Sequence, residues 1–330
     1  MVLGLLLSLV CLVLVVRDVQ WEVVAATLGE VHLLLLVAAV AVEFLTFWAI
    51  AVRWHRFFSP HKAPATGRLF KILNIAQLVN AVLPAKLGPL VRAYLAGQGE
   101  SSGVSFALTT IVGEKVLEGS SLLLVAVGLL PFIPLAGWQR PTTWVGAILL
   151  LVILGLMIWV AFRRRAVGGW LDSLLARWPR LLSMTHSALS ALDVWRSGRS
   201  VLILIGWSLF IWAITVLLNQ LLLWSLGIQV PPIAPVLVLV VLQIGIRLPS
   251  TPGNVGVFHY LSVVTLSLFG VEKNVALSYG VILHLVTYLP ASLLGLLYLS
   301  RTGYSLSRLR QIAGCVPSQT DLQDQWENLL

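Results

Sequence analysis

The sequence has little charge and almost no cysteine. Charged residues make up 11% of its 330 positions, and its 2 cysteines, Cys11 and Cys315, lie far apart in the chain. Two isolated cysteines exclude a disulfide framework and a cysteine-rich metal site. The chain also lacks a phosphate loop, a dinucleotide fingerprint, a serine elbow and a metal-spaced set of His, Asp and Glu. We therefore predict no cofactor, no metal and no catalytic residues, and we predict that the protein is not an enzyme.

Apolar residues dominate what remains. Hydrophobic residues account for 58% of the chain, and several runs approach the roughly 20 apolar residues that span a bilayer. This composition predicts an integral membrane protein. The net charge of +9 does not indicate nucleic acid, because the cations lie mainly in loops between apolar runs. The first run has no basic start and no cleavage site before Arg17, so we predict a short anchor helix there rather than a signal peptide.

Two apolar segments, 69–97 and 236–270, are interrupted by proline and glycine. Each half of such a segment, at about 1.5 Å per residue, reaches only part way across a ~30 Å hydrocarbon core. We therefore predict an all-α polytopic membrane protein with about six full transmembrane helices and two re-entrant helical hairpins. The full crossings are predicted at 1–16, 31–52, 104–130, 142–162, 201–224 and 275–299.

Loop charge predicts the orientation. Lys and Arg accumulate in short cytoplasmic loops. Basic clusters occur within 53–71, 163–199 and 301–310, after the second, fourth and last predicted crossings. All three clusters lie on one side of the membrane, and both termini are cytoplasmic, if the chain begins in the cytoplasm.

The two hairpins divide the chain into related halves. An odd number of crossings separates the hairpins, so they enter the membrane from opposite sides and form inverted repeats, the usual basis of alternating access. We predict a single membrane domain over 1–304, with halves at about 31–162 and 201–300. An amphipathic interfacial segment, 163–199, joins the halves, and 305–330 is a cytoplasmic tail.

The interruptions share one design. The sequence Leu-Pro-Ala-Lys-Leu-Gly at 83–88 recurs loosely as Leu-Pro-Ser-Thr-Pro-Gly at 248–253. Paired broken helices indicate a transporter binding site near the bilayer midplane. A new half-helix is predicted after Gly88 and after Gly253, where free amide groups and the positive helix dipole could bind a phosphate. The alternative is that both are ordinary kinks of membrane helices.

Charged side chains cluster near these breaks. Each ionisable group costs roughly 2.5–3.5 kcal/mol at hydrophobic depth, so it marks a pathway or a pair. Glu114 and Glu118 share one helix face and can meet Lys86 or Arg92. Three interpretations stay open: an internal salt-bridge lattice, a site for a phosphate or lipid headgroup, and a proton relay. The predicted substrate-binding residues are Lys86, Gly88, Arg92, Glu114, Lys115, Glu118, Arg247, Gly253, Asn254, His259 and His284.

Neutral polar residues allow two interpretations as well. Asn74, Gln77 and Asn80 are three apart on the first hairpin arm, where they can bind a headgroup or hold neighbouring helices together. His259 and His284 can titrate near neutral pH or be hydrogen-bonded inside the bundle.

The run from Asn80 to Tyr94, the run 248–258 and the residues Glu114, Lys115 and Glu118 resemble the lysylphosphatidylglycerol synthase transmembrane family. The resemblance extends from the second predicted crossing to the last. Members fused to an aminoacyltransferase domain make lysyl- or alanyl-phosphatidylglycerol, and their membrane part moves it between leaflets. We identify this chain as a stand-alone, flippase-like member without that domain. Because such relatives occur in bacteria and archaea, the resemblance implies a prokaryotic plasma membrane.

Three positions depart from the family pattern. Lys115 stands where Arg is usual, Glu118 where Asp is usual, and His284 where Arg is frequent. The first two changes preserve charge, although Lys cannot form the bidentate fork of Arg. The third removes a fixed cation.

Together these features predict the translocation of a phospholipid or other phosphate-bearing lipid. Lys86, Arg92 and Arg247 would attract the phosphate, and Glu114 and Glu118 would hold those cations. The expected partners are anionic or aminoacylated phospholipids or polyprenyl-type lipids. The alternative is a non-transporting membrane partner or scaffold for a separate cytoplasmic lipid-modifying enzyme. The sequence does not set the oligomeric state, the direction of transport or the energy source.

Overall fold

The computed structural model describes residues 2–58, 64–83, 86–98, 103–129, 198–247 and 250–301. Within these ranges the chain forms ten α-helices and one 3-10 turn and no strand, which confirms the all-α prediction. The predicted crossing at 142–162, the tail at 305–330 and nearly all of the segment 163–199 lie outside the described residues.

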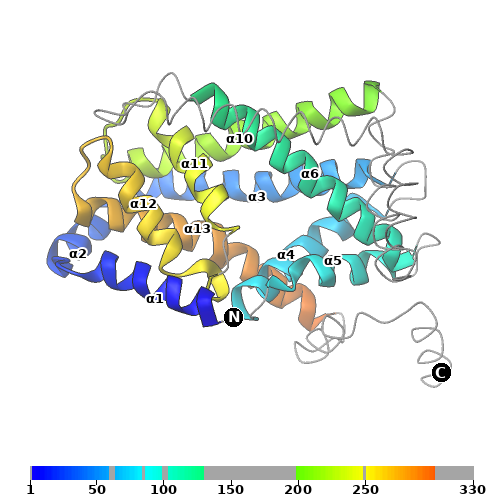
Figure 1. The fold of residues 1–330 in the computed structure, drawn as a ribbon, viewed down its shortest axis with the longest axis horizontal. Helices are drawn as coiled ribbons and strands as arrows, with labels where there is room; N and C mark the ends of the chain where they lie inside the picture. The colour runs from blue at the N-terminus through cyan, green and yellow to red at the C-terminus, as the bar shows by residue number, and fades with distance from the viewer. Residues whose placement is uncertain are drawn as a thin grey trace.

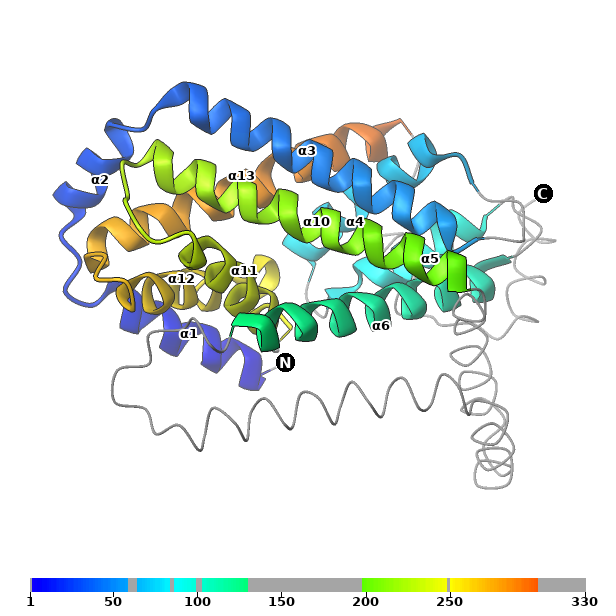
Figure 2. The ribbon, with the colours of Figure 1, turned by 90° about the horizontal axis from the view of Figure 1, so that it is seen from above.

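Three helices contain segments long and apolar enough to cross a membrane: α3 (Leu33–Arg56), α10 (Gly198–Ser225) and α13 (Lys273–Ser300). They confirm the crossings predicted at 31–52, 201–224 and 275–299. Figure 2 shows α3 and α10 side by side. A fourth helix, α6 (Gly103–Leu129), has 27 residues, about 40 Å at the helical rise. It is long enough to cross a membrane, but it contains three charged residues, Glu114, Lys115 and Glu118, and is not among the three apolar helices.

The first predicted crossing differs from the structure. Helix α1 (Val2–Val16) has 15 residues and is about 22 Å long, which falls short of a ~30 Å core. The chain then turns by 86° into α2 (Trp21–Gly29). Helix α1 packs on the second hairpin and α2 packs on α13. The anchor helix predicted over 1–16 is therefore present as α1, but by length it could cross a membrane only together with α2, as one bent pair.

Both predicted hairpins form. The first consists of α4 (Thr66–Val82) and α5 (Gly88–Gly97), and the second of α11 (Ile233–Gly245) and α12 (Val257–Ser267). In each hairpin the two arms pack against one another. Figure 1 shows α11 and α12 toward the left end of the molecule and α4 and α5 toward the other end. The hairpins thus enter the bundle from opposite ends.

Helix packing matches between the two halves. Helix α3 packs on α4 and α5 on α6, just as α10 packs on α11 and α12 on α13. Across the halves, α4 packs on α13 and α11 packs on α6, while α3 and α10 pack on each other. If α3, α4, α5 and α6 are equated with α10, α11, α12 and α13 in that order, the contacts exchange in pairs, and the contact between α3 and α10 maps onto itself. This two-fold pattern is expected of repeated halves.

The apolar core is divided. One cluster surrounds the end of α3 and the first hairpin, with Trp54, Phe58 and Leu69 fully buried. Another lies where α10, α12 and α13 meet, around Leu222 and Tyr279. Large apolar side chains also face outward along α1, α3, α10 and α13, which suits helices surrounded by lipid tails.

Candidate functional site

A cavity of about 510 Å³ lies where the two hairpins meet. It is lined by α3, α4, α5, α6, α10, α11, α12 and α13 and by both breaks. Six of the eleven predicted site residues line it: Lys86, Lys115, Glu118, Arg247, Gly253 and Asn254. The other five, Gly88, Arg92, Glu114, His259 and His284, do not line this cavity.

The lining is unbalanced in charge. Four cations, Arg53, Lys86, Lys115 and Arg247, face two carboxylates, and neutral polar side chains come from the first hairpin and from α11. A cleft lined mainly by one sign of charge raises the local concentration of ligands of the opposite sign. The cavity therefore favours an anion. Among the described residues, no three His, Cys, Asp or Glu side chains gather closely enough to hold a metal ion.

Beside the cavity, an ionic network joins helices α3, α5 and α6 of the first half. Glu114 is fully buried, and its two carboxylate oxygens accept hydrogen bonds from Arg53 Nη2, at 3.0 Å, and from Arg92 Nη2. Arg53 Nη2 also donates to Glu118 Oε1 at 2.7 Å. Arg92 lies over the ring of Trp54, with 4.1 Å from its guanidinium carbon to the ring centroid. Glu114 and Arg92 thus form a buried ion pair, the internal contact that the salt-bridge interpretation expects, and removing either partner would leave an unpaired buried charge.

At one end the network reaches the cavity. Lys115 Nζ donates to Glu118 Oε2 at 2.7 Å, and the Lys115 side chain is 49% exposed. Glu118 is shared between this exposed lysine and the buried Arg53. Its carboxylate therefore connects the structural core of the network to the space that a ligand would fill.

Arg53 is a site residue that sequence reasoning missed. We expected it to lie in a cytoplasmic loop after a crossing that ends at residue 52. Helix α3 instead continues to Arg56, and Arg53 is only 1% exposed. The signal was the large apolar residues that follow it, because Trp54, Phe57 and Phe58 belong to a buried helix end rather than to a polar loop.

Lys86 joins the two breaks. Of the two cations that Glu114 and Glu118 could meet, Arg92 pairs with Glu114, and Lys86 Nζ donates to the carbonyl oxygen of Ile246 at the end of α11. The residue has a positive φ of 51°, a conformation that non-glycine residues seldom adopt. The first break thus contacts the second directly.

Gly88 lets the two arms of the first hairpin approach each other closely. Helix α5 begins there, as expected, but the Gly88 amide donates to Asn80 Oδ1 on the opposite arm at 2.9 Å. A Cβ atom at position 88 would meet the Asn80 side chain. The first amide of this half-helix is therefore already paired. Asn80 therefore holds the two arms of the hairpin together, which is one of the two interpretations of the polar stripe. Asn80 and Gln77 also line the cavity.

The second break is built differently. Helix α12 begins at Val257 rather than after Gly253, because a 3-10 turn over Pro252–Asn254 comes first. Gly253 has a φ of +69°, which favours glycine. Asn254 Nδ2 donates to the Tyr288 hydroxyl at 2.8 Å. The predicted half-helix start at Gly253 is thus a turn, and neutral hydrogen bonds fix it.

The two histidines support the second break from behind. His284 Nε2 lies 2.8 Å from the Gly253 carbonyl oxygen; because that oxygen only accepts, Nε2 carries the proton. The His259 and His284 rings are 5.1 Å apart, and the ring of Tyr288 is 4.5 Å from that of His284. His284 is therefore hydrogen-bonded inside the bundle, the second of its two sequence interpretations.

Glu43 is a further residue to which the sequence assigned no role. It lies on α3, is 6% exposed and lines the cavity. No hydrogen bond or ion pair joins its carboxyl to another described residue. A carboxyl group buried without a partner is costly in a membrane bundle and by default marks a functional position. A lone acidic residue in a predicted crossing was the available signal.

Comparisons with known proteins identify the family of this chain. The family of the lysylphosphatidylglycerol synthase TM region matches residues 1–295. This chain belongs to that family. It is similar to a UPF0104 membrane protein of Methanothermobacter thermautotrophicus, with 23% identity over 322 residues that cover 91% of this chain and 94% of the relative. No solved structure matches the chain significantly. The family resemblance is thus confirmed, and the chain is an integral membrane protein.

Proposed function

We propose that this protein translocates a phosphate-bearing lipid across the membrane, with the headgroup held in the cavity between the two breaks. One observation carries the proposal: hairpins from opposite ends of the bundle together line one cavity that has an excess of cations. A site shared by two inverted broken elements is the arrangement that alternating access uses.

The size and lining of the cavity suit a headgroup rather than a whole lipid. Its volume of about 510 Å³ lies within the ~300–1,000 Å³ of small-molecule sites. Lys86 and Arg247, one from each break, would attract the phosphate, and Lys115 would add a third cation. The acyl chains would stay in the surrounding bilayer. We assign the chain a transport role without catalysis, in a prokaryotic plasma membrane with both termini in the cytoplasm.

The contact between the two breaks would have to open during the transport cycle. Lys86 binds the carbonyl of Ile246, so it cannot keep this bond while one hairpin moves away from the other. A headgroup phosphate competes for the same ammonium group. Lipid binding would thereby loosen the connection between the hairpins and favour the change of access.

The proposal is tested with purified protein in phospholipid vesicles. The labels are fluorescent phosphatidylglycerol, which is anionic, and fluorescent phosphatidylcholine, and dithionite quenching reports the fraction in the outer leaflet. We expect the wild type to speed translocation of the anionic label. The Lys86→Ala, Arg247→Ala double variant should slow it at least tenfold, a loss of about 1.4 kcal/mol in transition-state binding.

Arg17→Ala is the matched control, because Arg17 is a cation with a 75% exposed side chain that pairs only with Asp18 among the described residues. It should transport like the wild type. Transport by the wild type no faster than leakage in protein-free vesicles would refute translocation. In that case, capture of a lipid-modifying enzyme by the intact protein would favour the scaffold alternative.

A further inference from the structure

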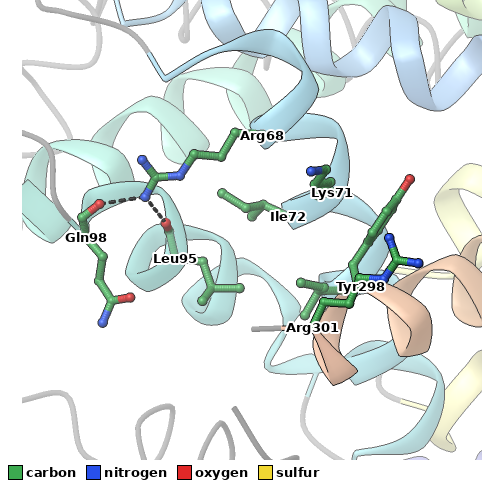
Figure 3. A pocket seen from close by; sticks show the side chains of 8 residues that line it. Arg68, Lys71, Ile72, Leu95, Gln98, Tyr298 and Arg301 are labelled. Atoms are coloured by element: carbon green, nitrogen blue, oxygen red, sulfur yellow. Dashed lines mark hydrogen bonds between the residues drawn. The ribbon is translucent and has the colours of Figure 1, made fainter. Parts of the chain in front are cut away.

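A second cavity, of about 490 Å³, lies at the far end of the first hairpin. It shares no lining residue with the central cavity. Figure 3 shows it between the start of α4, the end of α5 and the last turn of α13. Its lining consists of Arg68, Lys71, Ile72, Ile75, Leu95, Gln98, Tyr298 and Arg301.

The rim of this cavity is cationic. Three of its eight lining residues are Arg or Lys, and none of the eight is acidic. Arg68 Nη2 donates to the carbonyl oxygens of Leu95, at 3.1 Å, and Gln98, at 2.6 Å. Arg68 thus closes the open end of the hairpin and keeps its charge at the cavity wall. Neither Lys71 nor Arg301 forms an ion pair with another described residue.

The floor of the same cavity is apolar. Ile72, Ile75 and Leu95 are 4%, 2% and 8% exposed. Tyr298 forms one side, with Lys71 Nζ 5.8 Å from its ring centroid. A cationic rim above an apolar floor matches an amphiphile, whereas an inorganic anion would use the rim alone.

The position of the cavity agrees with this ligand. Tyr298 lies in the last turn of α13, a helix long enough to cross the membrane, and Arg301 directly follows that helix. Tyr, Lys and Arg gather where such helices meet the headgroup layer. A basic pocket between helices at this level is suited to an anionic headgroup.

We propose that this cavity is a second lipid site, which binds the phosphate of an anionic phospholipid between Lys71 and Arg301 while its glycerol and upper acyl region cover the apolar floor. A lipid held there bridges the first hairpin to α13. It would therefore steady the hairpin from the membrane face, apart from any cargo in the central cavity. The inference does not depend on translocation.

The test measures binding of short-chain phosphatidylglycerol to the full chain in detergent, by native mass spectrometry and by thermal unfolding. The Lys71→Ala, Arg301→Ala variant should bind one lipid fewer at low concentration, or bind it about 30-fold more weakly. Each Lys or Arg near a headgroup strengthens binding by about fivefold, and the variant loses two of them. The charge-preserving Lys71→Arg, Arg301→Lys variant should keep the lipid. Because ligand binding to the folded state raises its stability, phosphatidylglycerol should raise the unfolding temperature of proteins with this site more than that of the Lys71→Ala, Arg301→Ala variant.

Three further arms identify the source of the phosphate and separate the two sites. Short-chain phosphatidylcholine and inorganic phosphate should not replace the bound lipid at matched concentrations. The Lys86→Ala, Arg247→Ala variant should retain it. Unchanged binding in the Lys71→Ala, Arg301→Ala variant, equal binding of phosphatidylcholine, or displacement by inorganic phosphate would overturn the proposal. A protein that keeps this lipid but fails in the vesicle assay would refute translocation and leave the second site intact.

Discussion

The two breaks have matching helix packing but opposite chemistry. The first lies against a buried network in which Glu114 binds both Arg53 and Arg92. The second is fixed by the hydrogen bonds of Asn254 and His284, between neutral groups. Breaking a buried ion pair costs several times more than losing one neutral hydrogen bond. Repeated folds can thus place a rigid element and a more easily rearranged one at equivalent positions, and we expect the second break to move first.

The largest effect should come from opening the ionic network. Glu114→Gln leaves Arg92 without its carboxylate and removes one of the two carboxylates that bind Arg53. Removing one partner of a buried pair costs about 3–5 kcal/mol. Unfolding of the purified protein in detergent, followed with denaturant, should show a loss of this size.

Lys115→Ala provides the control within the same network. Its side chain is half exposed and pairs with Glu118 on the same helix, and such exposed pairs contribute about 0–1 kcal/mol. Similar losses for the two variants would show that the network is not the rigid element proposed for the first half.

An intermediate effect should follow from adding a side chain beside the second break. Gly256 has a φ of +88°, and a Cβ atom there would meet the backbone of Ser8 in α1. Gly256→Ala should therefore cost more than the about 1–3 kcal/mol of backbone strain alone. Thermal unfolding of the variant in detergent measures the loss.

Gly270→Ala separates the two causes. Gly270 also has a positive φ, of 76°, but among the described residues, its chain neighbours aside, no atom lies within 4 Å of the Cβ position. It should lose only the strain contribution. Equal destabilisation of the two variants would mean that α1 does not brace the second break.

The smallest effect should come from the neutral bond at the second break. Tyr288→Phe removes the hydroxyl that accepts from Asn254 Nδ2, and one such bond contributes about 0.5–1.5 kcal/mol. Equilibrium unfolding should report this modest loss. Tyr298→Phe, at a hydroxyl with no hydrogen bond to another described residue, should be nearly neutral. A loss for Tyr288→Phe as large as that for Glu114→Gln would contradict the comparison between the breaks.

Much of the fold was predictable from local patterns. The hairpins predicted at 69–97 and 236–270 appear as α4 with α5 and α11 with α12. Helix α3 was expected to end four residues too early, because Arg53 was interpreted as a loop cation. The 86° bend after α1 was also missed. A bend between short helices depends on what they pack against, and α1 and α2 pack on residues more than 200 positions away.

The candidate site was predictable as a set of residues but not as an arrangement. The sequence indicated Lys86 and Arg247 near the breaks, and both line the cavity. It also indicated His284, which instead binds the backbone of the second break. It assigned no role to Glu43, because a single carboxylate in an apolar run does not reveal whether it faces lipid, a partner or a cavity.

The sequence by itself determined that this is a helical membrane protein with two paired breaks, since apolar run length and the backbone limits of proline and glycine are local properties. Only the tertiary structure decided which partners the charged side chains contact. Arg53 and Glu114 are 61 positions apart, and Lys86 and Ile246 are 160 apart. Such pairs form because helices distant in the chain pack side by side. Packing thereby buries Glu114 and Arg92 in a network, places Lys86 and Arg247 in the cavity lining, and gives Arg53 and Glu118 a place in both.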